Sequence, residues 1–191
     1  MKPLISLDQL FADLFQHTHQ HSDQLPPVHL WHPKKSSDID LRIDKEGRWI
    51  HESSEIKKPA IVKLFSSLLK MEKNAYYLVT PKEKWQIQVD VAPLYIVSAE
   101  RIVREGVQVI SFSTNTDDHI LLDRHHPLSM QKFSGSFLPI VTVRDNLNGL
   151  ISRSVFYQLV EWGRTRSIGH GQNELIIESL GCDFSLGQYS A

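Results

Sequence analysis

Hydrophobic positions recur at helical spacing in two segments of the chain. The first segment follows Pro59, a residue that suits the first helical position because its missing N–H has no partner there. Its apolar stripe, at i, i+3, i+4, i+7 and i+8, consists of Ile61, Leu64, Phe65, Leu68 and Leu69. The second segment, from about 153 to 162, repeats this pattern at a constant offset of 95 positions (Ile56 to Ile151). The two patterns predict two amphipathic helices, each preceded by a cation.

Alternation of apolar and polar residues predicts strands around both helices. The run 39–43 alternates, and 48–51 would return as the second arm of a hairpin after Gly47. Further predicted strands cover 76–80, 85–91, 94–98, 107–112, 119–122, 137–143, 174–179 and 184–186. Residues 164–173, rich in cations and glycine, are expected to form a mobile loop. The pattern predicts an α+β fold in which two similar halves each have several antiparallel strands and one main helix, as expected from a duplication.

These elements divide the chain into three parts. Residues 1–24 are predicted to form an amphipathic helix and a His-rich linker, 25–92 a first α+β domain and 93–191 a second one. His17, His19 and His21 lie in the linker, and a helix would place the first and last of them on one face. Without a third ligand nearby, a polar helix end is favoured over a metal site, and no metal is predicted.

Composition narrows the classes of protein. The 191 residues are 41% hydrophobic and 23% charged, as in globular proteins, and the formal net charge is −1. That balance provides no global field for nucleic acid or an acidic membrane. The longest uncharged apolar run, 91–97, is too short to span a bilayer, and the single cysteine suits a reducing compartment. We therefore expect a cytoplasmic protein without membrane contact, and nucleic acid is disfavoured as a partner.

Recognisable catalytic motifs are missing from the sequence. It contains no Walker-type, dinucleotide-binding, nucleophile-elbow or zinc-helix pattern, and no cofactor is predicted. Asp44 and Asp145 could serve as acids or metal ligands, but both precede a turn, where aspartate hydrogen-bonds to the local backbone. The turn role is favoured. The question of enzymatic activity stays open, with the balance towards a protein that is not an enzyme.

Cations and aromatic rings near the two helix starts form the more informative set. If the two copies face each other, a cleft between them would offer cations for a phosphate and ring faces for a base. A helix N-terminus adds N–H donors for an anion. The candidate ligand-binding residues are Trp49, Lys58, Tyr77, Arg144 and Arg153. The competing interpretation is that such cations are solvated and such rings belong to the core.

Several runs resemble a known family. They are Trp49…Ile56-Lys57-Lys58-Pro59, Leu64-Phe65-Ser66-Ser67, Tyr77-Leu78-Val79-Thr80-Pro81…Glu83-Lys84 and Val143-Arg144-Asp145…Leu150-Ile151-Ser152-Arg153…Tyr157…Leu159-Val160-Glu161. From about Pro26 to the C-terminus the chain resembles the bacterial family catalogued as domain of unknown function 1285. The resemblance implies a duplicated α+β architecture with a superficially pleckstrin-homology-like C-terminal half. It also implies a nucleotide-type ligand site at the interface of the halves and a role in signal transduction.

The chain departs from this family at the first helix start. The family tends to have a Gly-Ser-Pro stretch with an arginine there, whereas this chain has 52–55 (Glu-Ser-Ser-Glu) and Lys58. Lysine is a point charge without the bidentate fork of arginine, so the geometry of a phosphate contact would differ. Lys82 also stands where the family tends to be apolar.

Three hypotheses follow for the function. The first is a non-enzymatic sensor that binds a nucleotide-like anionic ligand, with Lys58, Arg144 and Arg153 on the phosphate and Trp49 or Tyr77 against the ring. The second is a protein-interaction adaptor that uses the first helix or a sheet edge and binds no small ligand. The third is an enzyme without a recognisable motif.

Overall fold

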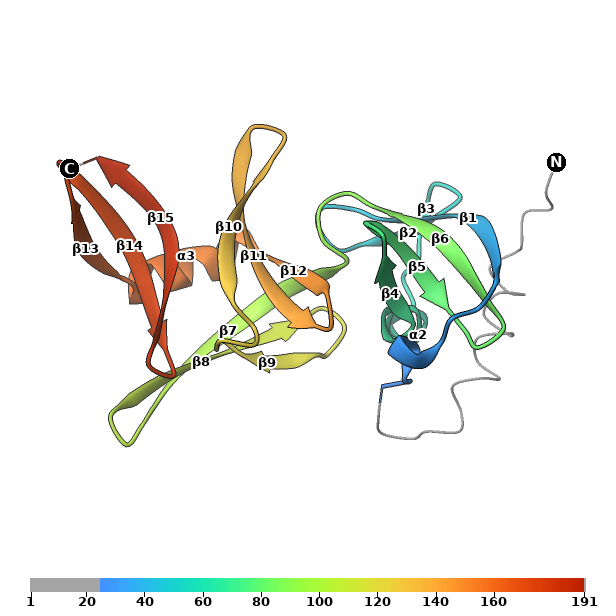
Figure 1. Ribbon diagram of the computed structural model, residues 1–191, viewed down its shortest axis with the longest axis horizontal. Coiled ribbons are helices and arrows are strands. Elements are labelled where there is room, and N and C mark those ends of the chain that lie inside the picture. Colours follow the sequence, from blue (N-terminus) through green and yellow to red (C-terminus); the bar gives the residue numbers. More distant parts are fainter. Residues whose placement is uncertain (1–24, 191) are drawn as a thin grey trace. The chain divides into compact units, whose positions relative to one another are not determined.

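The computed structural model describes residues 25–190, and the chain divides into two compact units, 1–93 and 94–191. Figure 1 shows the elements of both units. The amphipathic helix and His-rich linker predicted for 1–24 lie outside the described residues.

The first unit contains one six-stranded sheet and one α-helix. Its elements are η1 (Val28–Leu30), β1 (Lys35–Ile43), β2 (Trp49–His51), β3 (Ser54–Glu55), α2 (Pro59–Ser67), β4 (Leu69–Glu72), β5 (Ala75–Val79) and β6 (Glu83–Val89). The strand order is β3-β2-β1-β6-β5-β4. Strands β1 and β6 pair in parallel, and all other neighbours in this sheet are antiparallel.

The second unit contains a six-stranded sheet, a three-stranded sheet and one α-helix. Its elements are β7 (Leu94–Arg104), β8 (Val107–Thr114), β9 (His119–Leu121), β10 (Leu128–Phe133), β11 (Ser136–Arg144), β12 (Leu147–Ile151), α3 (Arg153–Trp162), β13 (Arg164–Gly169), β14 (Gln172–Ser179) and β15 (Cys182–Ser190). The strand orders are β10-β11-β12-β7-β8-β9 and β13-β14-β15. Strands β7 and β12 pair in parallel.

The two six-stranded sheets have the same topology. In each, two three-stranded meanders are joined because the first strand of the unit pairs in parallel with the sixth. This agreement is consistent with a duplicated domain. The prediction of antiparallel strands alone was wrong for this central pair, and the described residues, with fifteen strands and two α-helices, are mostly β rather than an even α+β mixture.

The two helices occupy different places in this common topology. Helix α2 lies between β3 and β4, whereas α3 follows β12, and the second unit joins β9 to β10 through residues 122–127 without a helix. The predicted correspondence of the two helices as copies is therefore wrong. An apolar stripe that follows a cation indicates a helix that buries one of its faces. The stripe carries no information on where that helix lies relative to the order of the strands.

One local prediction was also wrong. Residues 164–173 were expected to be a loop, but they form β13, a turn at His170 and Gly171 with both residues at positive φ, and the start of β14. All six residues of β13 are exposed, so no apolar alternation marks this strand. Gly149 lies inside β12, and a Cβ there would lie 3.0 Å from side-chain atoms of Ile96 and Val143. Glycine thus allows close packing beside the central strand pair.

The core of the first unit forms between its sheet and α2. Trp49 on β2 and Phe65 on α2 pack with their ring centroids 5.7 Å apart and their planes tilted by 54°. The largest fully buried side chains of this unit are Trp49, Trp85, Phe65, Leu41, Ile43, Leu68, Leu69 and Leu78. Large aromatic side chains contribute most of the buried apolar area in such a core.

We predict that Phe65→Ala destabilises the first unit strongly. Removal of a fully buried ring costs both transfer energy and cavity energy, about 3–5 kcal/mol in comparable cores. Urea denaturation followed by tryptophan fluorescence would measure the loss. The exposed Phe137 provides a matched control, since Phe137→Ala should change the free energy of unfolding by no more than about 0.5 kcal/mol. Equal effects of the two substitutions would contradict the packing described here.

Asp44 closes the turn between β1 and β2. Its Oδ1 accepts hydrogen bonds from the backbone N–H of Glu46 at 2.9 Å and of Arg48 at 3.0 Å, and its Oδ2 accepts one from Arg48 Nε at 2.8 Å. These contacts confirm the turn role predicted for this residue. Asp145 also lies at a turn, between β11 and β12, with φ of 46°. Burial alone would raise the pKa of Asp44, but the hydrogen bonds from Arg48 and Glu46 and the charge of Arg48 outweigh burial and lower it.

This lowered pKa predicts a pH-dependent contribution to stability. The contribution is complete above the ordinary aspartate pKa of about 4 and is lost as the pH falls through the lower value of the folded state. Asp44→Asn should remove this part of the acid dependence in urea denaturation between neutral and acid pH. Asp38→Asn, at an exposed position of β1, should leave it in place. An unchanged acid dependence in Asp44→Asn would show that other groups produce it.

Candidate functional site

The five candidate residues predicted from the sequence lie in both units. Trp49, Lys58 and Tyr77 belong to the first, and Arg144 and Arg153 to the second. Trp49 is only 1% exposed, and its indole Nε1 is buried without a hydrogen-bond partner among the described residues. A ring enclosed in this way cannot offer a face to a ligand, so the role predicted for Trp49 is replaced by a role in the core.

Lys58 and Tyr77 are accessible but lie on different elements. Lys58 is the exposed residue before α2, and its side chain does not cap the helix. Tyr77 lies on β5, half-buried, and the ammonium of Lys84 is 4.6 Å from the centroid of its ring. One face of the Tyr77 ring is therefore already next to a cation, which is an arrangement that electrostatic attraction to the ring favours.

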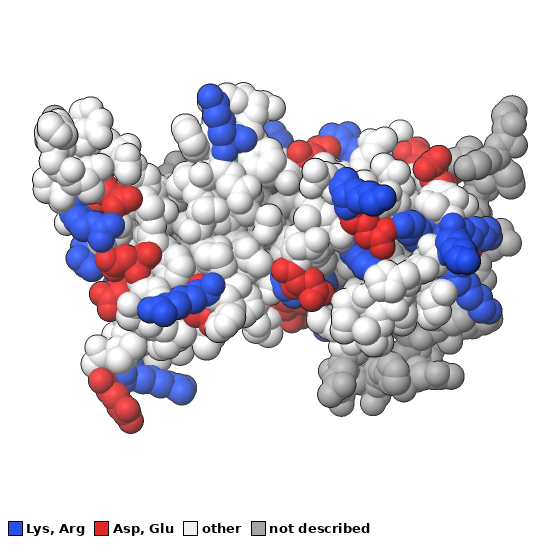
Figure 2. Space-filling model, viewed as in Figure 1, with Lys and Arg blue, Asp and Glu red and all other residues white. Residues whose placement is uncertain are grey.

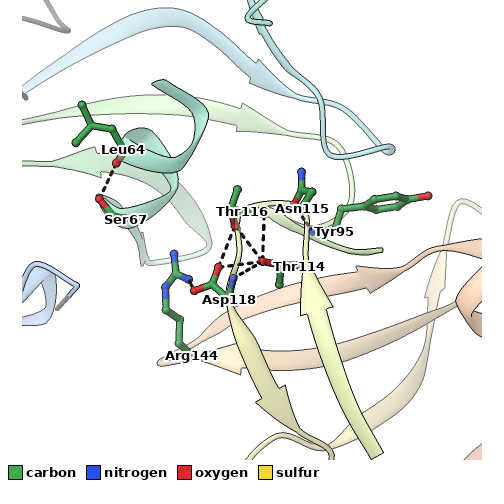
Figure 3. A network of polar contacts seen from close by, with 8 residues as sticks. All are labelled: Leu64, Ser67, Tyr95, Thr114, Asn115, Thr116, Asp118 and Arg144. Atoms are coloured by element: carbon green, nitrogen blue, oxygen red, sulfur yellow. Dashed lines mark hydrogen bonds and ion pairs between the residues drawn. The ribbon is translucent and has the colours of Figure 1, made fainter. Parts of the chain in front are cut away.

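Arg144 is held in a network at the turn after β8 (Figure 3). Its guanidinium forms an ion pair with Asp118, and both side chains are at most 16% exposed. Asp118 Oδ2 accepts hydrogen bonds from Thr114 Oγ1 at 3.1 Å and from Thr116 Oγ1 at 2.9 Å. With this carboxylate engaged on both oxygens, Arg144 stabilises the turn between β8 and β9.

Arg153 is the first residue of α3 and is exposed. The preceding residue, Ser152, caps the helix, and its Oγ accepts a hydrogen bond from the backbone N–H of Val155 at 3.4 Å. A serine at this position explains why the helix begins here. A binding site that requires both units, as the sequence suggested, stays a prediction.

A concave site lies within the second unit and was missed by the sequence reasoning. It is a groove of about 320 Å³ between the end of the β7–β8 hairpin, the end of α3, and strands β13 and β14. Its lining consists of Val103, Gly106, Gln108, Trp162, Arg164, Ile176 and Glu178. The hairpin extends far beyond the short strands β9 and β12 of its own sheet, which is visible in Figure 1.

Backbone and side-chain hydrogen bonds fix this hairpin to the three-stranded sheet. Gln108 Nε2 donates to the carbonyl of Glu178 at 2.6 Å, and the N–H of Leu180 donates to the carbonyl of Gln108 at 2.8 Å. Val103 is directly opposite Gln108 in the hairpin, so both side chains are on the face towards the groove. The hairpin thereby forms one wall of the groove.

The other wall carries an aromatic ring with a cation on it. Trp162 is the last residue of α3, and the guanidinium of Arg101 on β7 is 5.3 Å from the centroid of its indole ring. Gly163, which follows, allows α3 to approach β14, because a Cβ there would be 3.1 Å from the carbonyl oxygen of Ile176. Among the described residues, Arg101 has no carboxylate within ion-pair distance.

The opposite rim of the groove carries charged side chains that form ion pairs with one another. Arg164 Nη2 lies 3.0 Å from Asp183 and 3.8 Å from Glu178, and the neighbouring Arg166 contacts Asp183 at 3.1 Å and Glu174 at 2.7 Å. The hydrogen bond from Arg166 is the main cause that lowers the pKa of Glu174, which keeps this buried carboxylate ionised. The acids on this side are thus engaged with arginines of β13.

The side chains that line the groove include no serine, cysteine or histidine, and the carboxylate among them is that of Glu178. Among residues 25–190 there is also no group of three His, Cys, Asp or Glu side chains that could hold a metal. Neither α2 nor α3, the α-helices of the described part, has the length and apolarity to cross a bilayer.

Comparisons with known proteins identify the family. Residues 26–92 match the model described as domain of unknown function (DUF1285), N-terminal domain, and residues 93–186 match the model for the C-terminal domain of DUF1285. No curated protein matched the chain.

Two solved structures are similar. A DUF1285 family protein from Silicibacter pomeroyi DSS-3 shares 37% identity with a TM-score of 0.78, over 94% of this chain and 95% of that one. A DUF1285 family protein from Shewanella baltica OS155 shares 26% identity with a TM-score of 0.51, over 64% of this chain and 91% of that one. These matches confirm the resemblance found in the sequence: the chain belongs to the DUF1285 family.

Proposed function

We propose that this protein is a non-enzymatic binding protein for a small anionic, nucleotide-like ligand, and that the ligand occupies the groove of the second unit. The observation that supports this proposal is the guanidinium of Arg101 beside the Trp162 ring at the edge of a groove of about 320 Å³. Ligand pockets in proteins are commonly about 300–1,000 Å³ in volume. The groove is therefore large enough for a nucleotide-sized molecule.

The chemistry of the groove fits such a ligand in two ways. A guanidinium binds a phosphate through two parallel hydrogen bonds, and Arg101 has no competing carboxylate among the described residues. An indole ring and the apolar side chains of Val103 and Ile176 provide surface for a flat, largely apolar base. These are the interactions expected from the sequence, phosphate on a cation and base on a ring, but at residues that the sequence did not indicate.

A role in signal transduction is part of the same proposal. It is supported by the family resemblance of the sequence. A pleckstrin-homology-like second unit is also proposed, and the feature in its favour is that α3 directly follows the six strands of that unit's larger sheet.

Long nucleic acids are not proposed as ligands. Figure 2 shows blue and red side chains interspersed over the second unit, on the face in view, rather than one patch of a single sign. Binding to a nucleic acid backbone depends on a continuous positive surface. The formal net charge of −1 agrees with this.

A protein-interaction adaptor is the second candidate function. Exposed apolar side chains are concentrated on the β7–β8 hairpin and on α3, where they are Ile102, Val103, Val107, Tyr157 and Val160. Exposed apolar side chains in such numbers can mark a surface that contacts another protein. Val103 also lines the groove, so a partner on this surface would compete with a small ligand.

Isothermal titration of the full chain with mononucleotides, cyclic nucleotides and dinucleotides tests the proposal. We expect one of them to bind, and Arg101→Met and Trp162→Leu each to weaken that binding about tenfold or more. Arg104→Met is the matched control: this exposed arginine ends the same strand on the alternate face, and its substitution should leave binding unchanged.

Other outcomes would overturn the proposal in distinct ways. If no nucleotide binds the wild-type chain, the proposed function is wrong. If a nucleotide binds and Arg101→Met has no effect, while Lys58→Met or Arg153→Met abolishes binding, the ligand lies at the helix starts predicted from the sequence and not in the groove.

A further inference from the structure

The first unit contains a second concentration of cations, on the polar face of its sheet. Lys70 and Glu72 on β4, Tyr77 on β5 and Lys84 on β6 come together there. The residues that alternate with them along the same strands, Leu69, Leu78 and Trp85, are buried in the core on the opposite face. The polar face is therefore defined by the register of the sheet.

The contacts within this cluster show an imbalance of charge. Glu72 forms ion pairs with both lysines, to Lys70 at 3.2 Å and to Lys84 over a shorter distance. Lys70 also donates to the backbone carbonyl of Trp31 at 2.7 Å and lies 3.5 Å from His32 Nδ1. Two ammonium groups thus share one carboxylate.

The three charged side chains of this cluster lie where water is partly excluded. The side chains of Lys70 and Lys84 are only 14% and 19% exposed, and that of Glu72 is 24% exposed. The neighbouring acid Glu83 forms an ion pair with Lys35. Asp38, which lies on β1 opposite Gln86 of β6, is exposed. A partly buried positive charge without a matching negative one is unfavourable, because desolvation penalises the charged form.

We propose that the Lys70–Lys84 pair is a binding site for a phosphate group, distinct from the groove of the second unit. A phosphate would supply the missing negative charge and would accept N–H groups of Lys84 that Glu72 does not use, since an ammonium has three donors. Lys70, whose ammonium also contacts Trp31 and His32, would contribute mainly its charge. The hydrogen bond from Lys84 to Glu72 is the main cause that lowers the pKa of this glutamate. Glu72 stays ionised at neutral pH, holds the two lysines together, and limits the affinity for an anion.

Tyr77 suggests that the phosphate can be part of an organic molecule. Its ring lies beside the ammonium of Lys84, with the centroid 4.6 Å away, and the exposed Gln86 is directly opposite Tyr77 in the sheet. A phosphate held by Lys84 would therefore lie near a half-buried ring and an amide. Inorganic phosphate and phenyl phosphate share the anionic group and differ only in the presence of a ring.

The test is a calorimetric titration of the full chain with inorganic phosphate and, separately, with phenyl phosphate, at constant ionic strength maintained with chloride. We expect saturable binding of phosphate that Lys84→Met and Lys70→Met each weaken about tenfold or more. Glu72→Gln should tighten binding, because it removes the competing carboxylate and keeps a side chain of the same size. Circular dichroism of each variant would show that the sheet is intact, and Lys84→Arg, which retains the charge, should retain binding.

Two controls separate this site from other cations. Lys45→Met, at an exposed turn of the same unit, should leave phosphate binding unchanged. Arg101→Met should also leave it unchanged, so that failure of the groove proposal does not affect this one. Phosphate binding that is absent in the wild type, that survives Lys84→Met in a folded protein, or that weakens in Glu72→Gln would overturn the proposal. Tighter binding of phenyl phosphate than of phosphate would identify an organic phosphate as the ligand.

Discussion

The parallel pairing of the first and sixth strands holds the six-stranded sheet of each unit together. In the first unit β1 pairs with β6, and the N–H of Asp90 extends the pairing by donating to the carbonyl of Ile43 at 3.0 Å. In the second, β7 pairs with β12, and the N–H of Ser152 donates to the carbonyl of Ile96 at 3.1 Å. Each meander alone is a small three-stranded sheet, and one of its edge strands faces the other meander. The parallel pairing joins these two edge strands, so that neither remains an exposed edge. The chain between the first and sixth strands must close into a long loop before any hydrogen bond of this pairing can form.

The pairing also positions the candidate sites. Strand β7 is anchored at its start by β12, and its far end continues with β8 as a hairpin that reaches β14. Arg101 and Val103 lie on that far end, so their position beside Trp162 depends on the anchoring of β7. In the first unit, Lys84 lies on β6, the strand that β1 fixes on one side and β5 on the other. Both sites thus include residues on a strand of the central parallel pair.

Local chemistry was predictable from the sequence wherever it depends on neighbours along the chain. The helix Arg153–Trp162 has the predicted bounds, because Ser152 caps its start and the apolar stripe defines its buried face. Asp44 closes a turn through residues two and four positions later. Parallel pairing could not be predicted, because no local pattern distinguishes a strand with a parallel neighbour from one with antiparallel neighbours. Strand β13 was missed because every one of its residues is exposed.

The candidate site was less predictable than the fold, and the arginines and lysines show why. Arg144 is engaged by Asp118, and Lys70 shares its carboxylate with Lys84. Arg101 lies on a tryptophan ring, and no carboxylate within residues 25–190 forms an ion pair with it. Which cation retains capacity for an anion depends on partners that are far away in the sequence. Family resemblance indicated the fold family, but Trp162, a half-buried ring of the second unit, lies at a helix end that gave no such signal.

Hydrogen–deuterium exchange of the full chain, resolved to single amides by NMR, tests the central claim most directly. If the parallel pairs hold the sheets together, amides of β1, β6, β7 and β12, including those of Asp90 and Ser152, should be the slowest to exchange in their sheets. Amides of the edge strands β3 and β9 should exchange much faster. Exchange in the central pairs as fast as in these edge strands would contradict the account.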